Sequence, residues 1–288
     1  MSNPIILDGK SLADKIKRDL KEKTSQLYRH PGLAVVMIGD NQASEIYVKN
    51  KKKDCIECGF DISIHRFKTY SKEQDITHLI QKLNNDETVD GIIVQLPLPS
   101  HYDTQKILQS VRSSKDIDGF TLANTGKLYA GIPGISPCTP AGIMRLLSHY
   151  NADLTGKHCT IVGRSDVVGK PLSYMMLQKN ATVTICHSKT PKDVLAQMIQ
   201  TSDIFVSAVG NPNYLWKELK KYPKVLIDVG INRVNSKLLG DIPVEWWEHC
   251  EAYTPVPGGV GPMTRAMLMH NLYMASKSRQ EKAAARRK

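Results

Sequence analysis

Long apolar runs are missing from this sequence of 288 residues, of which 41% are hydrophobic and 23% are charged. No stretch approaches the roughly 18–20 uninterrupted apolar residues of a membrane helix, which excludes a membrane span. Residues 1–10 do not join a charged start to an apolar core, as a secretory signal would. We therefore expect a globular cytoplasmic protein, long enough for two domains of roughly 100–200 residues each.

Cysteine is sparse, and the spacing of its six residues excludes a small domain built on disulfides. Cys55 and Cys58 form the only CxxC pair, and neither a second pair nor histidines at zinc-ligand spacing accompany it. We interpret this pair as packing residues in a lysine-rich helix. The sequence thus predicts no metal site, and it predicts free thiols in a reducing compartment.

Acidic residues are outnumbered, with 28 Asp and Glu against 39 Lys and Arg, which gives a net charge of +11. Much of the excess lies in residues 277–288, which we interpret as a frayed, solvated tail. The remaining positive charge suits a protein whose ligands are anionic small molecules. A second basic cluster, residues 49–53, has no interleaved aromatic residues, so nucleic-acid binding is a less favoured alternative.

Strand-like and helix-like segments alternate along the first half of the chain, and this order predicts a parallel sheet covered on both faces. Clustered Pro and Gly between residues 119 and 140 then indicate a linker or domain edge. The expected elements are strands at 33–38, 62–67 and 89–96 and helices at 43–58 and 72–83.

The same alternation starts again after the linker, which predicts a second α/β domain with a Rossmann-like, doubly wound parallel sheet. Helices that begin near Pro140 and Pro262 are expected to join the two domains, which returns the C-terminus to the first. We therefore predict a catalytic domain of residues 1–137 and 262–288, and a nucleotide-binding domain of residues 138–261. The expected elements are strands at 158–162, 181–186, 203–209 and 225–229 and helices at 171–179, 191–200, 215–220 and 262–276.

A glycine-containing loop, residues 163–171, joins a strand to a helix in the second domain. A doubly wound sheet binds a pyrophosphate at this position, where free N–H groups of the helix N-terminus face the anion. The loop differs from GxGxxG because Ser165 replaces the middle glycine, while Gly163 and Gly169 are present. Its place between strand and helix favours a dinucleotide site over a purely steric use of glycine.

The end of the next strand indicates which dinucleotide binds. An NAD site usually has an acidic residue about 20 residues after the loop, bonded to the ribose. No acid occurs in residues 186–190; Arg164, Ser188 and Lys189 instead offer hydrogen-bond donors or positive charge to a ribose phosphate. We therefore predict NADP, the alternative being an ordinary polar turn.

Lys51 lies on the apolar stripe of the expected helix 43–58, together with Tyr47 and Val48. Such a lysine either extends its ammonium group to the edge of the packed face or is held in a partly dry cleft with a lowered pKa. Gln95 favours the cleft, because it ends an apolar strand at the sheet edge where α/β proteins bind ligands. Its amide oxygen can accept a hydrogen bond from Lys51.

Two further loops contain candidate ligand-binding residues. Asp116 and Asp118 precede Gly119, and acidic residues before a glycine are by themselves typical of a turn. The loop at 255–264 has three glycines before a helix, so its backbone N–H groups can approach a flat or anionic ligand; Pro257, Gly258 and Gly259 are the candidates.

Together, these motifs occur in an order that resembles the bifunctional methylenetetrahydrofolate dehydrogenase/methenyltetrahydrofolate cyclohydrolase family, over essentially the whole chain. The departures are at residues 240–245, where Gly-Asp-Ile-Pro-Val-Glu replaces the commoner Gly-Asp-Val-Asp pattern, and in the basic tail. The motifs are Tyr47-Val-Lys-Asn-Lys51, Asp90-Gly-Ile-Ile-Val-Gln95-Leu-Pro-Leu-Pro99, Lys115-Asp-Ile-Asp118-Gly119, Pro137-Cys-Thr-Pro140, Gly163-Arg-Ser165, Asp228-Val-Gly-Ile-Asn-Arg233 and Pro257-Gly-Gly-Val-Gly-Pro-Met-Thr264.

The resemblance implies a homodimer of two-domain subunits with the folate in a cleft between the domains. It also implies oxidation of methylene- to methenyl-tetrahydrofolate with NADP, followed by hydrolysis to formyl-tetrahydrofolate. A dehydrogenase without the hydrolase step stays an alternative, because it would carry the same cofactor loop. The implied roles are Lys51 as the catalytic lysine, Gln95 as its tuning partner, Tyr47 near the pterin, Asp118 as the pterin anchor, and Gly163, Arg164, Ser165 and Ile231 at the cofactor.

Overall fold

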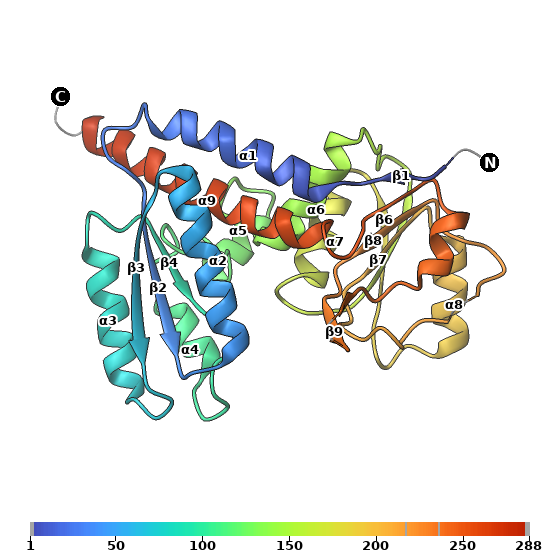
Figure 1. The fold of residues 1–288 in the computed structure, drawn as a ribbon, viewed down its shortest axis with the longest axis horizontal. Helices are drawn as coiled ribbons and strands as arrows, with labels where there is room; N and C mark the ends of the chain where they lie inside the picture. Colours follow the sequence, from blue (N-terminus) through green and yellow to red (C-terminus); the bar gives the residue numbers. More distant parts are fainter. Residues whose placement is uncertain (1–2, 217, 236, 286–288) are drawn as a thin grey trace. The chain divides into compact units, whose positions relative to one another are not determined.

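The computed structural model describes residues 3–216, 218–235 and 237–285, and it divides into two compact α/β units. The unit of residues 14–138 and 265–288 is called the three-stranded unit here, and that of residues 1–13 and 139–264 the six-stranded unit. Figure 1 shows the elements of each. Within the described residues, no helix is long and apolar enough to cross a bilayer.

The three-stranded unit contains a parallel sheet in the order β3-β2-β4. Because β2 is central, the chain leaves it on one side for β3 and returns on the other for β4. The carboxyl ends of β2 and β4 therefore form a topological switch point, where such sheets bind ligands. The strands are β2 (Gly32–Ile38), β3 (Asp61–Phe67) and β4 (Gly91–Val94), with helices α2 (Gln42–Cys58), α3 (Glu73–Asn85), α4 (Thr104–Gln109) and α5 (Leu122–Tyr129).

All seven residues of β2 are buried, so both faces of this sheet are covered, as the continuous apolar run predicted. Ala34, Val36 and Ile38 belong to one core cluster with Ile76 and Ile80 of α3. The apolar pattern thus correctly predicted the three strands and the two long helices that enclose them.

The six-stranded unit contains a second parallel sheet, in the order β1-β11-β8-β7-β5-β6. The chain runs from β5 outward to β6 and then returns to β7 on the other side of β5, which makes β5 the switch point. The elements are β1 (Ile5–Ile6), β5 (His158–Val162), β6 (Thr182–Cys186), β7 (Ile204–Ser207), β8 (Val225–Asp228), β11 (Ala252–Tyr253), the hairpin β9 (Asn232–Val234) and β10 (Lys237–Leu239), α6 (Cys138–His149), α7 (Gly169–Leu177), α8 (Lys192–Thr201) and the 3-10 helix η1 (Val244–His249).

Three expectations about local structure differ from what is observed. The stretch at 119–140, expected as a linker or domain edge, contains the boundary between the units after residue 138, but also a helix, α5, whose N-terminus is capped by the Thr121 side chain. The helix expected at 215–220 does not form in the described residues 215–216 and 218–220, and residue 217 lies outside the description. The N-terminal segment groups with the six-stranded unit, because β1 pairs in parallel with β11.

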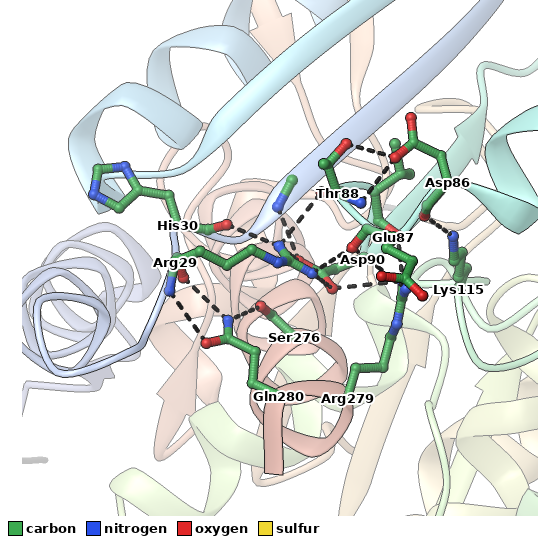
Figure 2. Close-up of polar contacts among 12 residues, drawn as sticks. Arg29, His30, Asp86, Glu87, Thr88, Asp90, Lys115, Ser276, Arg279 and Gln280 are labelled. Atoms are coloured by element: carbon green, nitrogen blue, oxygen red, sulfur yellow. Dashed lines mark hydrogen bonds and ion pairs between the residues drawn. The ribbon is translucent and has the colours of Figure 1, made fainter. Parts of the chain in front are cut away.

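The last helix, α9 (Val260–Ala285), is longer than the predicted end at residue 276. The interpretation of residues 277–288 as a frayed tail is therefore wrong as far as residue 285, and residues 286–288 lie outside the description. In Figure 2, Arg279 and Gln280 point toward Arg29 and the loop before β4. The Gln280 side chain accepts from Arg29 N at 3.2 Å and donates to Arg29 O at 3.0 Å.

A buried carboxylate, Asp90, is the centre of that contact region. The Arg29 guanidinium donates to both of its oxygens, at 2.6 and 2.7 Å, and Arg279 Nη1 lies 3.5 Å from it. Arg29 lies three residues before β2, and Asp90 directly precedes β4. The end of α9 is thus fixed to the amino ends of these two strands.

Candidate active and nucleotide-binding sites

Lys51 and Gln95 meet in the three-stranded unit, as the sequence predicted. The Lys51 ammonium donates to Gln95 Oε1 at 2.7 Å, and Gln95 Nε2 donates to Leu96 O at 2.7 Å. Gln95 is buried at the carboxyl end of β4, and its backbone N–H donates to Val36 O of β2. This amide therefore has one orientation, with its oxygen toward Lys51, at the switch point of the sheet.

The helix that carries Lys51 is defined at both ends. The Asn41 side chain accepts from Ser44 N at its start, and Gly59, with a left-handed φ of 73°, ends it. The predicted stripe is largely correct, since Val48, Cys55 and Cys58 are buried. Tyr47 belongs to the same stripe but is 49% exposed, so its ring is accessible to a ligand.

An ion-pair network that the sequence did not predict fixes α2 one turn after Lys51. The buried Asp54 accepts two hydrogen bonds from Arg265 of α9, at 2.6 and 2.7 Å. Lys17 of α1 (Gly9–Thr24) lies 3.4 Å from the same carboxylate and 2.7 Å from Glu57. No local pattern identifies this pairing, because Asp54 and Arg265 are 211 positions apart.

The turn of residues 116–121 separates the roles of its two acids. The Asp116 carboxylate accepts from the backbone N–H groups of Gly119, Phe120 and Thr121 and from Asn124 Nδ2, at 2.7–3.1 Å. Asp116 thus has the turn-closing role that the sequence pattern by itself predicted for both acids. Among the described residues, no hydrogen bond goes to the Asp118 carboxylate, which leaves it for a ligand.

Asp118 lies in the electrostatic neighbourhood of Lys51. Burial raises the pKa of the Asp118 carboxyl to about 6, while the nearby charge of Lys51 lowers this pKa and that of Asp116 raises it. The structure therefore gathers Lys51, Gln95 and Asp118 in one unit: a cation, an amide that orients it, and an acid without a partner of its own.

The six-stranded unit provides a second candidate site, called the glycine cradle here, which is the loop of residues 163–169 between β5 and α7. A side chain at Gly163, whose φ is 130°, would place its Cβ 2.6 Å from Ala208 O, and one at Gly169 would place it 1.9 Å from Gly163 O. Only glycines fit at these two positions. α7 begins directly after this loop, at the switch point; in its first turn Lys170 N donates to Ser165 O, Leu172 N donates to Val168 O, and Pro171 has no N–H.

The polar residues predicted around this cradle are accessible. Arg164 and Ser165 are exposed, and Ser165 Oγ accepts from Val168 N at 3.1 Å. Ser188 is exposed in the turn after β6, which is held by the bond from His187 N to the Thr190 hydroxyl at 2.9 Å. These residues fit the phosphate-bearing side of a dinucleotide.

A pocket of about 110 Å³ brings together Ile231 and the glycine-rich loop. A ligand pocket usually measures about 300–1,000 Å³, so this one has room for part of a ligand only. A larger hollow of about 450 Å³ elsewhere in the unit is lined by exposed glutamates and contains none of the predicted residues. The smaller pocket is lined by Asp228, Val229, Gly230, Ile231, Leu238, Pro255, Val256, Pro257, Gly258, Gly259, Val260, Gly261 and Pro262.

Comparison with known proteins gives matches over nearly the whole chain. The family model of the tetrahydrofolate dehydrogenase/cyclohydrolase catalytic domain matches residues 7–118, and that of the NAD(P)-binding domain matches residues 137–280. A relative from Campylobacter hominis named bifunctional protein FolD is 45% identical over 279 residues, which cover 95% of this chain and 98% of the relative. One of the same name from Hydrogenobaculum is 48% identical over 277 residues, which cover 95% and 99%.

Solved structures agree with these matches. The bifunctional FolD enzyme of Campylobacter jejuni has a TM-score of 0.92 at 44% identity, covering 95% of this chain and 99% of that one. The Trypanosoma brucei methylenetetrahydrofolate dehydrogenase-cyclohydrolase, solved with NADP and an inhibitor, has a TM-score of 0.92 at 33% identity, covering 96% and 99%.

Proposed function

Because the chain belongs to the tetrahydrofolate dehydrogenase/cyclohydrolase family, we infer that it oxidises 5,10-methylenetetrahydrofolate with NADP and hydrolyses the product to 10-formyltetrahydrofolate. The observation that carries this function is the bond of Lys51 to Gln95, because hydrolysis requires proton transfer by a positioned group. Both activities act on the same folate, and we propose that the three-stranded unit binds it.

Lys51, Gln95, Tyr47 and Asp118 are the residues that we propose for catalysis. Gln95 holds the Lys51 ammonium at one position through its amide oxygen, so that this group can exchange protons with the reacting folate or a water molecule. The exposed ring of Tyr47 offers a flat surface for the pterin. Asp118, with no partner of its own among the described residues, can accept two N–H groups of the pterin ring.

NADP fits the glycine cradle of the six-stranded unit. Gly163 would let the backbone approach the pyrophosphate, next to the start of α7. We propose that Arg164, Ser165 and Ser188 bind the ribose phosphate, and that Ile231 packs against the cofactor ring. Bound NADP supplies the hydride acceptor for the first reaction.

We propose Pro257, Gly258 and Gly259 as further contacts for the flat ring of the substrate, because these residues line the pocket next to Ile231 and Pro257 is exposed. We also propose that the protein is cytoplasmic and forms a homodimer. The six buried cysteines are all free, which supports a reducing compartment. Ile5 and Ile6, on the edge strand β1, are 58% and 51% exposed, which supports a partner at the surface of the chain.

Replacing Lys51 by Met tests the proposed catalysis. Lys51→Met removes the charge and keeps much of the apolar stem, so the variant is expected to fold. Hydrolysis of methenyltetrahydrofolate should fall by about 100-fold or more, because general acid–base catalysis is lost. Dehydrogenase activity should fall less, because hydride transfer depends mainly on alignment.

The measurement is the loss of methenyl absorbance above the uncatalysed rate, with a circular dichroism melt of the same sample. Lys52→Met is the matched control, since Lys52 is the next residue of α2 and is exposed. Hydrolysis at the wild-type rate by folded Lys51→Met would remove Lys51 from the mechanism.

A further inference from the structure

A carboxylate outside the predicted site, Asp241, accepts hydrogen bonds from both loops that follow the central strands of the six-stranded sheet. It lies after β10, in the Gly-Asp pair that the sequence shares with the commoner pattern, and is 1% exposed. Its Oδ2 accepts from Val209 N at 2.8 Å, Gly210 N at 3.0 Å and Ser207 Oγ at 3.2 Å. Asp241 therefore fixes the loop that leaves β7.

The second oxygen of Asp241 reaches the turn that leaves β8. Asp241 Oδ1 accepts from Asn232 Nδ2 at 2.9 Å and also from Asn211 N at 2.9 Å. Ile231, the proposed cofactor contact, directly precedes Asn232 and is 51% exposed. One buried carboxylate thus joins the loop at 208–211 to the turn that presents Ile231.

The backbone of Asp241 is held by a second buried acid, Asp228, at the end of β8. Asp228 Oδ1 accepts from Asp241 N at 3.0 Å and Gly230 N at 2.9 Å, and its Oδ2 accepts from Ile242 N at 2.8 Å. A Cβ at Gly230 would lie 2.2 Å from Asp241 Oδ1. Any side chain at position 230 would therefore push the Asp241 carboxylate out of its place.

These loops border the glycine cradle. Val162, Ser207 and Asp228 pair in adjacent strands in register, so Gly163, Ala208 and Val229 emerge from one edge of the sheet. Ala208 O is the atom that a Cβ at Gly163 would meet, at 2.6 Å. The loop fixed by Asp241 is hence in contact with the loop proposed to bind the pyrophosphate.

We propose that Asp241 is a positioning residue for the dinucleotide: it holds the loop at 208–211 and the turn at 229–232 in the arrangement that receives NADP. This role rests on the proposed NADP site in the same unit. Asp241 acts through the loops and is not itself a cofactor contact. A carboxylate suits this role because it only accepts hydrogen bonds, and all five of its partners are donors.

The test is Asp241→Asn in the full chain. The amide NH2 would face N–H donors, so the loops lose bonds while the side-chain volume stays the same. We expect KM for NADP to rise by about tenfold or more. KM for the folate and the nucleotide-free hydrolysis of methenyltetrahydrofolate should stay within about twofold of wild type. A general loss of structure would change all of these quantities together.

Asp203→Asn is the matched control, since Asp203 also accepts a backbone N–H, from His158 at 3.0 Å, but precedes β7 at the opposite edge of the sheet. It should leave KM for NADP unchanged. If Asp241→Asn does not fold, Asn232→Ala removes one of the five bonds to Asp241, together with the bond from Asn232 Nδ2 to Gly240 O, and should raise KM for NADP by about three- to fivefold.

NADP binding to each variant, measured by calorimetry without folate, separates this inference from the proposed function. If the wild-type protein binds NADP but does not oxidise the folate, the proposed function is wrong. The role of Asp241 is then still tested by comparing the NADP affinities of the wild-type protein and of Asp241→Asn. A folded Asp241→Asn variant with wild-type NADP affinity would overturn the inference.

Discussion

At the scale of single residues, Asp118 combines burial with a free carboxylate. Its pKa of about 6, raised by burial, means that the group is ionised at neutral pH and protonated in mild acid. Protonation removes one acceptor, so the anchoring of the pterin should weaken as the pH falls below 6. The raised pKa also means that this carboxyl stabilises the ligand-free fold below about pH 4, and that this contribution is lost as the pH rises through 6.

We expect the Kd for tetrahydrofolate to rise by about tenfold for each pH unit below 6, approaching the slope of a single titrating group. Calorimetric titrations between about pH 5 and pH 8 measure this dependence. Asp118→Asn should bind the folate weakly at every pH and lose the dependence, while NADP affinity at pH 8 is retained. If the Kd of the wild-type protein for tetrahydrofolate does not change across this pH range, Asp118 does not anchor the pterin and has a structural role only.

At the scale of elements, the last turns of α9 determine how firmly the amino ends of β2 and β4 are held. Gln280 pairs with both backbone groups of Arg29, as a neighbouring strand would, and it donates to Ser276 Oγ at 2.9 Å. These bonds are partly buried, so each is worth about 0.5–1.5 kcal/mol. Arg279 and Gln280 of the basic tail are thus a packed part of the three-stranded unit.

Gln280→Ala should lower the free energy of unfolding by about 1–2 kcal/mol, because the bonds to the Arg29 backbone are lost. Urea titration followed by circular dichroism measures the change as a shift of the transition midpoint. Lys282→Ala is the control on the same helix, since Lys282 is exposed, and it should shift the midpoint little. Equal midpoints for both variants would mean that the contact adds no stability.

The same scale shows what the sequence could predict. The apolar period of α2 placed Lys51 on the packed stripe, and the end of an apolar strand identified Gln95, because both signals lie within a few residues. The bond of Gln280 to Arg29 joins residues 251 apart, and that of Arg265 to Asp54 joins residues 211 apart. Such pairs follow from the packing of elements, which no local period records.

At the scale of the whole molecule, we expect the homodimer to be the main species in solution. Among the residues that the structure describes, the edge strand β1 pairs on one side only, with β11, and its two isoleucines are exposed. Sedimentation equilibrium should give twice the 32.2 kDa mass of one chain at micromolar concentrations. A single species of one chain's mass across that range would contradict the dimer.

The close approach of the Asp228 carboxylate to Gly240 also limits which substitutions this sequence can accept during evolution. The backbone angle at Gly240 is one that any residue adopts, yet a Cβ there would lie 2.0 Å from Asp228 Oδ2, and the other two nearest atoms also belong to the Asp228 side chain. The glycine is thus required by a neighbour and not by its own conformation. A lineage that keeps the acid must keep the glycine, whereas one that first loses the acid is free to replace it. The order of the two substitutions therefore decides which of them is tolerated.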